Sequence, residues 1–257
     1  MKHKWMSWIT GILLCTVTLN AAALSRPPLD DQTERPRILM VVTGHGTFPK
    51  SGKQTGLWLS EFAEPWQIFV NAGCEVTVAV PGGGEVPIDP RSMTDEAQPE
   101  NTGAALVALR DPVPLREVDG SGFDAVFFPG GHGTMFDFPN NPPVQTALEY
   151  FLLADRPVAL VCHGPAALVG AETEGGQPLV KGRRVTAFAN SEEEAVELSD
   201  QVPFLLESRL EELGAAVETA PDFSEHVVVD GLLITGQNPA SSAKAAEKLL
   251  EQIRMKD

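Results

Sequence analysis

Short, nearly continuous apolar runs recur along the chain, and amphipathic segments separate them. The clearest runs are residues 37–42, 124–128 and 157–161. A strand with one covered face alternates polar and apolar residues, whereas a continuous apolar run is typical of a strand buried on both faces. Residues 57–72 and 143–154 instead carry apolar residues at helical spacing. We therefore predict an α/β fold with a mostly parallel sheet and helices on both of its faces.

Further segments continue this alternation along the chain. The other expected elements are a strand over 75–80, helices at 164–169 and 203–213, a strand at 184–188, a hairpin at 227–234 that turns at Asp230 and Gly231, and a final helix over 240–254. Residues 84–122 are irregular and rich in Pro, Asp and Gly, with at most one helix around 103–109. Because structureless loops of this length usually have a function, we expect this insertion to lie on the surface or over a site.

The first residues have the composition of an export signal. Lys2 and Lys4 precede an apolar stretch over residues 5–19, and three alanines end the segment at Ala23. The order basic, apolar, small is that of a secretory signal peptide, and the stretch is shorter than the roughly 20 residues that span a bilayer. We predict a signal peptide over 1–23, a tether over 24–35 and a single domain over 36–257. The expected location is the periplasm or the exterior, without stable membrane insertion after cleavage.

The charge balance and the cysteines narrow the possible partners. The chain has 35 Asp and Glu residues against 19 Lys and Arg, a formal net charge of −16. Phosphate backbones repel such a chain, so we exclude nucleic acid as a partner. Without the signal segment, Cys74 and Cys162 remain. Export permits a disulfide between them, but Cys74 stands at the start of a strand, where a small buried thiol is typical.

A reactive cysteine is the strongest functional signal in the sequence. The apolar run over 157–161 leads directly into Cys162, His163, Gly164 and Pro165. This is the strand, turn and helix context of a nucleophile elbow, with Cys in place of Ser. The N-terminus of a following helix would lower the pKa of the thiol. The alternative is a structural cysteine that ends a core strand, followed by a histidine that happens to be adjacent.

Two weaker patterns accompany the cysteine. Gly130, Gly131 and His132 follow the strand over 124–128, and consecutive glycines let backbone amides approach a ligand closely, as an oxyanion site requires. Glu61 lies early in the helix over 57–72, where the sequence leaves the direction of its side chain open. The histidines at 45, 132, 163 and 226 are dispersed and lack metal-ligand spacing, so we predict no metal.

Four motifs together resemble the ThiJ/PfpI superfamily, whose fold is like that of class I glutamine amidotransferases. They are Thr55–Glu61, Pro129–Thr134, Cys162–Pro165 and Thr235–Ser242. More closely they resemble the HchA-like branch, whose members are described as glyoxalase III enzymes, as chaperones and as deglycases. The resemblance covers roughly residues 36–254 and implies a flavodoxin-like three-layer sandwich. It also implies a homodimer.

The resemblance also implies roles for single residues. Cys162 would be the nucleophile, with His163 and Glu61 beside it and His132 lining the pocket next to the oxyanion amides of Gly130 and Gly131. An acidic residue would orient the histidine, and by its position it falls on Glu193 within the acidic run 192–194. Any of the three acids in that run remains a candidate, and the run is also typical of a charged helix start.

The activity implied by the resemblance is that of a glutathione-independent glyoxalase of the D-lactate dehydratase type. Such an enzyme converts methylglyoxal or a related 2-oxoaldehyde to a 2-hydroxy acid through a thiohemiacetal on Cys162. No cofactor is expected, because one carbon of the substrate is oxidised while its neighbour is reduced. The alternatives are a holdase chaperone or protein deglycase, and a cysteine amidase or peptidase on the same elbow.

Overall fold

The computed structural model describes residues 35–93 and 102–255. The predicted signal peptide over 1–23 lies outside the described residues, as does the predicted tether apart from Arg35. None of the helices in the described part of the chain has the length and apolar character that a membrane span requires.

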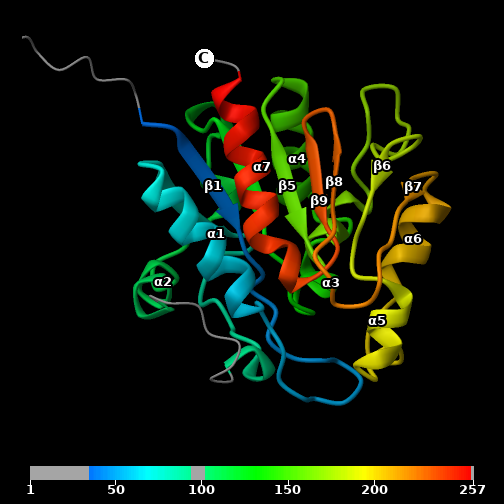
Figure 1. Ribbon diagram of the computed structural model, residues 1–257. Helices are drawn as coiled ribbons and strands as arrows, with labels where there is room; N and C mark the ends of the chain where they lie inside the picture. The colour runs from blue at the N-terminus through cyan, green and yellow to red at the C-terminus, as the bar shows by residue number, and fades with distance from the viewer. Residues whose placement is uncertain (1–34, 94–101, 256–257) are drawn as a thin grey trace, which may run out of the picture. The chain divides into compact units, whose positions relative to one another are not determined.

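A seven-stranded sheet forms the centre of the domain, with the strand order β3-β2-β1-β4-β5-β9-β8 (Figure 1). All neighbouring strands are parallel except β8 and β9, which form the predicted hairpin. This confirms the predicted fold class. The strands are β1 Arg37–Val41, β2 Glu75–Val80, β3 Val113–Pro114, β4 Ala125–Phe128, β5 Val158–Val161, β8 Val227–Asp230 and β9 Leu233–Gly236.

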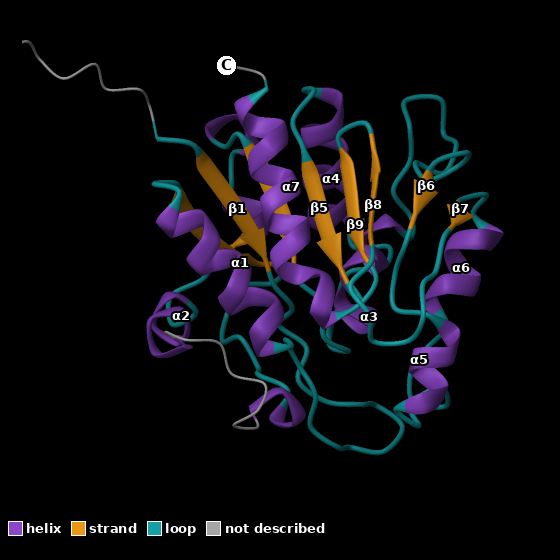
Figure 2. Cartoon of the chain, viewed as in Figure 1, coloured by secondary structure: helices purple, strands orange, loops and turns teal. Residues whose placement is uncertain are grey.

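Helices cover both faces of this sheet (Figure 2). Helices α1 and α7 pack against each other on one face, and α2 lies beside α1. Helix α4 contacts β4 and β5 on the other face. The α-helices are α1 Leu59–Asn71, α2 Thr102–Ala108, α3 Thr134–Asp137, α4 Pro142–Leu153, α5 Asn190–Ala195, α6 Leu206–Glu212 and α7 Ser242–Arg254.

The apolar runs are continuous because alternate residues enter different cores. In β5, Val158 and Leu160 join the core under α4, whereas Ala159 and Val161 join the core under α1 and α7. All four side chains are fully buried. Both faces of the strand therefore exclude polar residues, as expected for a covered parallel sheet.

Three predicted elements were wrong in detail. The expected helix at 164–169 is a 3₁₀-helix, η5 Gly164–Leu168, whose first residue packs so close to the Phe128 carbonyl that any side chain would collide with it. The expected strand at 184–188 ends at Val185, because the next amide donates to the Thr235 hydroxyl instead of a strand. This short strand, β6 Arg184–Val185, pairs with β7 Ala216–Val217 in a separate sheet. The hairpin turns at Gly231 and Leu232, one residue later than expected.

The irregular insertion between β2 and β4 contains α2, which matches the expected helix, and the edge strand β3. It also contains the 3₁₀-helices η1 Pro90–Met93, η3 Leu115–Glu117 and η4 Gly120–Gly122. Residues 94–101 lie outside the described part. The segment with η1 follows a parallel bridge between Leu57 and Ile88, which brings it to the start of α1.

Candidate active site

Cys162 occupies a sharp turn at the carboxyl end of β5. Its φ of 58° lies in the left-handed region, which is uncommon for a residue other than glycine. Backbone hydrogen bonds hold the turn on both sides: the Cys162 amide donates to Gly236 and its carbonyl accepts from Phe188. A strained nucleophile at the end of a buried strand is the geometry of a nucleophile elbow. The side chain is 3% exposed.

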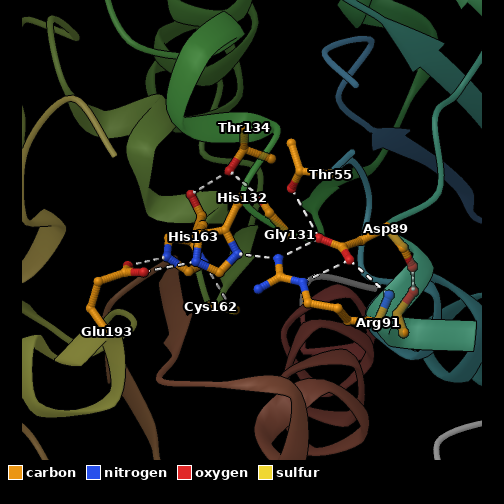
Figure 3. A network of polar contacts seen from close by, with 10 residues as sticks. Thr55, Asp89, Arg91, Gly131, His132, Thr134, Cys162, His163 and Glu193 are labelled. Carbon is orange, nitrogen blue, oxygen red and sulfur yellow. Dashed lines mark hydrogen bonds and ion pairs between the residues drawn. The ribbon is translucent and has the colours of Figure 1, made fainter. Parts of the chain in front are cut away.

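His163 links the sulfur to an acid. Its Nδ1 lies 3.2 Å from the Cys162 Sγ, and its Nε2 lies 2.7 Å from Oε2 of Glu193 (Figure 3). A carboxylate only accepts hydrogen bonds, so the Nε2 atom carries the proton and the Nδ1 lone pair faces the thiol. This is the arrangement of a nucleophile, a base and an orienting acid.

The structure distinguishes the three adjacent acids at the start of α5. Glu193 is the one whose carboxylate reaches His163, and it is 3% exposed. Glu192 is fully buried and accepts hydrogen bonds from the Ala189 and Phe223 amides and from the Asn238 side chain. The side chain of Glu194 is exposed. Helix α5 thus presents one acid to the site, one to its own start and one to solvent.

The Glu193 carboxylate serves a second histidine. Its Oε1 lies 2.8 Å from Nε2 of His132, and the ring centroids of His132 and His163 are 4.1 Å apart. Burial would raise the pKa of Glu193, but the electrostatic effect of His163 and the hydrogen bonds from both histidines outweigh it and lower this pKa below its ordinary value. Burial, then the neighbouring His163, lowers the pKa of His132 to about 4, so that ring is neutral at pH 7.

A second acid, Glu61, acts on the thiol of Cys162. It is fully buried in the first turn of α1, and its Oε2 accepts a hydrogen bond of 2.8 Å from the Gly130 amide. Its other oxygen, Oε1, is buried and has no hydrogen-bond partner among the described residues. Burial raises the pKa of Glu61 to about 8, against the opposing effects of the Cys162 thiol and of the hydrogen bond from the Gly130 amide. Glu61 is therefore a protonated carboxylic acid at pH 7.

The expected oxyanion amides divide into two roles. Gly130 was expected to offer its amide to a substrate, and this prediction was wrong because that amide is held by Glu61. The Gly131 amide instead acts on Cys162, where its electrostatic effect lowers the pKa of the thiol. Gly131 has a φ of 92°, and a side chain there would collide with the backbone of Gly56 and Trp58. Only glycine allows this close approach between the end of β4 and the start of α1.

The expected lowering of the thiol pKa was also wrong. Burial raises the pKa of Cys162 well above its usual range, and the nearby Glu61 carboxyl raises it further. The five-residue 3₁₀-helix η5 that follows does not supply the helix end from which the lower pKa was expected. A thiol in this setting reacts by passing its proton to the adjacent His163 as the new bond forms.

The sequence patterns did not reveal the polar residues that contact His132 through its Nδ1 atom. Its Nδ1 lies 3.2 Å from Nη2 of Arg91, and Arg91 forms an ion pair with the buried Asp89. Asp89 also accepts a hydrogen bond from the Thr55 hydroxyl. The available signal was an acid, a proline and an arginine at 89–91 within a long irregular loop, a pattern without a known spacing for chemistry.

Within the described residues, His132, His163 and Glu193 form a group whose donor atoms lie within 4.8 Å of one another and could hold a metal ion. The wide spacing of the histidines in the sequence therefore did not show which of them lie close together, because the ends of β4 and β5 bring His132 and His163 into contact. Each of these donor atoms already makes a hydrogen bond within the group. The absence of a metal stays a prediction. Both Cys74 and Cys162 are free, and Cys74 is 8% exposed, which confirms the predicted buried thiol.

Known proteins share both the sequence pattern and the fold. A profile described as the DJ-1/PfpI family matches residues 55–252. Glyoxalase 3 of Candida albicans is 28% identical over 228 residues, which cover 83% of this chain and 97% of that protein. A glutathione-independent glyoxalase of Schizosaccharomyces pombe is 30% identical over 232 residues, covering 84% and 95% of the two chains.

Solved structures show the same likeness. The crystal structure of glyoxalase III from Candida albicans matches with a TM-score of 0.78 at 26% identity, over 84% of this chain and 97% of that one. The Rapid Encystment Protein of 24 kDa from Francisella tularensis matches with a TM-score of 0.81 at 34% identity, over 85% and 99% of the two chains.

Proposed function

The chain belongs to the DJ-1/PfpI family, and from this premise we propose that it is a glutathione-independent glyoxalase acting on methylglyoxal or a related 2-oxoaldehyde. The observation that carries the proposal is the chain of contacts from Glu193 through His163 to the Cys162 sulfur, together with the buried, protonated carboxyl of Glu61 that acts on the same thiol. Curated relatives named as glyoxalases at 28% and 30% identity over most of their length support the same reaction class.

In the first step, Cys162 attacks the aldehyde carbon of the substrate. His163 Nδ1 takes the thiol proton as the carbon–sulfur bond forms. The carbonyl oxygen gains a proton from the Glu61 carboxyl, and the Gly131 amide lies where it can stabilise the developing negative charge. The product is a hemithioacetal, and no electron enters or leaves the protein.

In the second step, a proton moves between two neighbouring carbons. The Glu61 carboxylate formed in the first step removes a proton from the carbon attached to sulfur while the protonated His163 gives its proton to the ketone oxygen, and an enediol results. Glu61 then protonates the adjacent carbon, and the hydroxyl group on the first carbon returns its proton to His163. The first carbon becomes a thioester and the second an alcohol, so oxidation and reduction balance within the substrate. Water hydrolyses the thioester to a 2-hydroxy acid, lactate from methylglyoxal, and restores the thiol.

A lactate assay with matched cysteine variants tests the proposal. The purified protein is incubated with methylglyoxal without glutathione, and lactate is measured. Cys162→Ala should lose at least about 10³-fold in kcat, since the covalent route needs the sulfur. Cys74→Ala is the control: it removes the other free buried thiol and should retain full activity.

The outcomes separate the alternatives. A Cys162→Ala variant as active as the wild type would refute the covalent route. Amide cleavage that depends on Cys162, without lactate, would show a hydrolase on the same elbow.

Two further properties are proposed from the sequence. Export to the periplasm or exterior, with cleavage near Ala23, is supported by the basic, apolar and small-residue order of the first segment. A homodimer is supported by the family resemblance. N-terminal sequencing of the protein recovered from cell fractions and light scattering of the purified chain test these two properties.

A further inference from the structure

We propose that Arg91 is a positioning residue that fixes the tautomer of His132 and, through Glu193, the orientation of His163 at the reactive sulfur. The proposal rests on the proposed function, because the rate that Arg91 would affect is that of the glyoxalase reaction. Arg91 belongs to η1 in the irregular insertion, far in sequence from the cysteine. Figure 3 shows the chain of polar contacts from Asp89 to Cys162.

The first link holds the guanidinium group in place. The Asp89 carboxylate is fully buried, and it accepts hydrogen bonds from Nε and Nη2 of Arg91 at 3.0 and 2.5 Å. The rings of Phe48 and Trp58 lie 5.7 and 5.9 Å from the guanidinium carbon. A guanidinium group held in a two-point contact with a carboxylate and flanked by aromatic rings has little rotational freedom.

The second link assigns the proton on His132. The Arg91 Nη2 lies 3.2 Å from the His132 Nδ1. The nitrogens of a guanidinium group donate hydrogen bonds and do not accept them, so Nδ1 must be the acceptor. In the neutral ring the proton then resides on Nε2, which lies 2.8 Å from Oε1 of Glu193 and donates to it.

The third link reaches the reactive sulfur. With Oε1 of Glu193 occupied by His132, the other oxygen accepts from Nε2 of His163 at 2.7 Å. His163 therefore keeps its Nδ1 lone pair toward Cys162, as a base requires. The opposite tautomer of His132 would place a nitrogen lone pair against a carboxylate oxygen, and their repulsion would turn the Glu193 carboxylate away from both rings.

The effect of removing Arg91 should depend on pH. The titratable and charged groups that face His132 in the described part of the chain are Arg91 from η1, His163 after β5 and Glu193 from α5. A protonated imidazole carries a proton on both nitrogens. Without Arg91, protonation of His132 in acid should restore the donor to Glu193, whereas in the neutral ring at higher pH only the Glu193 carboxylate would still favour a proton on Nε2, and the tautomer would be less firmly fixed.

Steady-state kinetics of matched arginine variants provide the first test. Arg91→Met should lower kcat about tenfold near neutral pH and leave KM within about twofold, and the deficit should shrink as the pH falls toward about 4, where His132 becomes protonated. Arg91→Lys should retain more activity, because an ammonium group also only donates to Nδ1. Arg209→Met is the control, since its side chain is 40% exposed against 39% for Arg91, and it also pairs with a nearby acid, Glu212.

Nitrogen NMR of the protein labelled with ¹⁵N-histidine provides a second test that does not depend on turnover. Wild-type His132, assigned from the signal that His132→Gln removes, should be the Nε2–H tautomer alone. In the Arg91→Met variant, His132 should be a mixture of the Nε2–H and Nδ1–H tautomers. If the wild type made no lactate, the proposed function would fail, and the tautomer would still decide the role of Arg91.

Two results would overturn the proposal. A rise in KM with unchanged kcat in Arg91→Met would make Arg91 a substrate-binding residue instead. A loss of kcat that is equal at every pH, with His132 still in a single tautomer, would reduce Arg91 to a structural support for the loop.

Discussion

Two carboxyl groups flank Cys162, and their environments drive them to opposite protonation states. Glu61 is fully buried, one of its oxygens accepts from a single amide and the other has no hydrogen-bond partner among the described residues, and burial raises its pKa to about 8. Glu193 is nearly as buried, but two histidines donate to it, and its pKa falls below the ordinary value. Two glutamates of one site are thus in different states: Glu61 is a neutral carboxylic acid and Glu193 is a carboxylate anion.

This difference indicates a division of labour. A site that holds one carboxyl protonated and another ionised can supply and accept protons in the same reaction at one pH. In the proposed mechanism the protonated Glu61 supplies the proton to the carbonyl oxygen, and the ionised Glu193 holds the imidazole that takes the thiol proton. The contrast comes from their hydrogen-bond donors, since both residues are shielded from water.

The largest loss of activity is expected when the ionised carboxylate, Glu193, is replaced. Glu193→Gln replaces an acceptor with an amide whose nitrogen donates, so His163 would move its proton to Nδ1 and point it at the thiol. We expect kcat to fall by roughly 10³- to 10⁴-fold, the scale of the tautomer error in a related triad. Lactate assays measure this loss, and Glu194→Gln, which changes an exposed neighbour, should match the wild type.

Replacing the protonated carboxyl group, Glu61, should lower kcat by less, and it should change how activity depends on pH. Glu61→Gln keeps the acceptor for the Gly130 amide but removes the transferable proton, and kcat should fall by roughly 10²- to 10³-fold. In the wild type, kcat/KM should decline as pH rises through about 8, because Glu61 then loses its proton. An alkaline decline that persists unchanged in Glu61→Gln would assign it to another group.

The same variant should change how stability depends on pH. In the folded protein Glu61 keeps its proton up to about pH 8, whereas in the unfolded chain it loses the proton above about 4.5. The native state therefore binds more protons in this window, and the free energy of unfolding falls as pH rises. Relative to Glu61→Gln, the wild type should lose roughly 3 kcal/mol between about pH 5 and 8.

Urea unfolding of both proteins at several pH values measures this difference. Parallel stability curves would mean that Glu61 is ionised in the folded state, and the contrast with Glu193 would then disappear.

The smallest effect on activity is expected at Glu192, the residue that precedes Glu193 in α5. Glu192→Gln places a donor against the donors of Ala189, Phe223 or Asn238, and should lower the free energy of unfolding by about 2 kcal/mol. Its kcat should stay within about threefold of the wild type, since Glu192 does not contact the histidines. A loss of activity as large as that of Glu193→Gln would show that the helix itself, and not one carboxylate, orients His163.

Much of the fold could be predicted from local patterns. The apolar runs around β1, β4 and β5 follow directly from burial on two faces, and the elbow motif placed Cys162 at a strand end. The sequence did not decide which acid in the run 192–194 orients His163. Helix α5 turns by about 100° per residue, and only its packing against the rest of the domain decides which face points inward. Arg91 belongs to no motif that the sequence reveals, since it lies in η1 and its partner His132 follows 41 residues later, after β4.

The sequence by itself determined the order of strands and helices, the family and the cysteine at the end of β5, because these depend on the spacing of apolar residues and on turns within a few residues. Only the tertiary structure decided the protonation states around that cysteine. The pKa of a buried group depends on the donors and charges within a few ångströms, and here they come from α1, α5, η1 and the ends of β4 and β5. That is why the expected low pKa of the thiol was wrong, while the position of the sulfur between an acid and an imidazole followed from the fold.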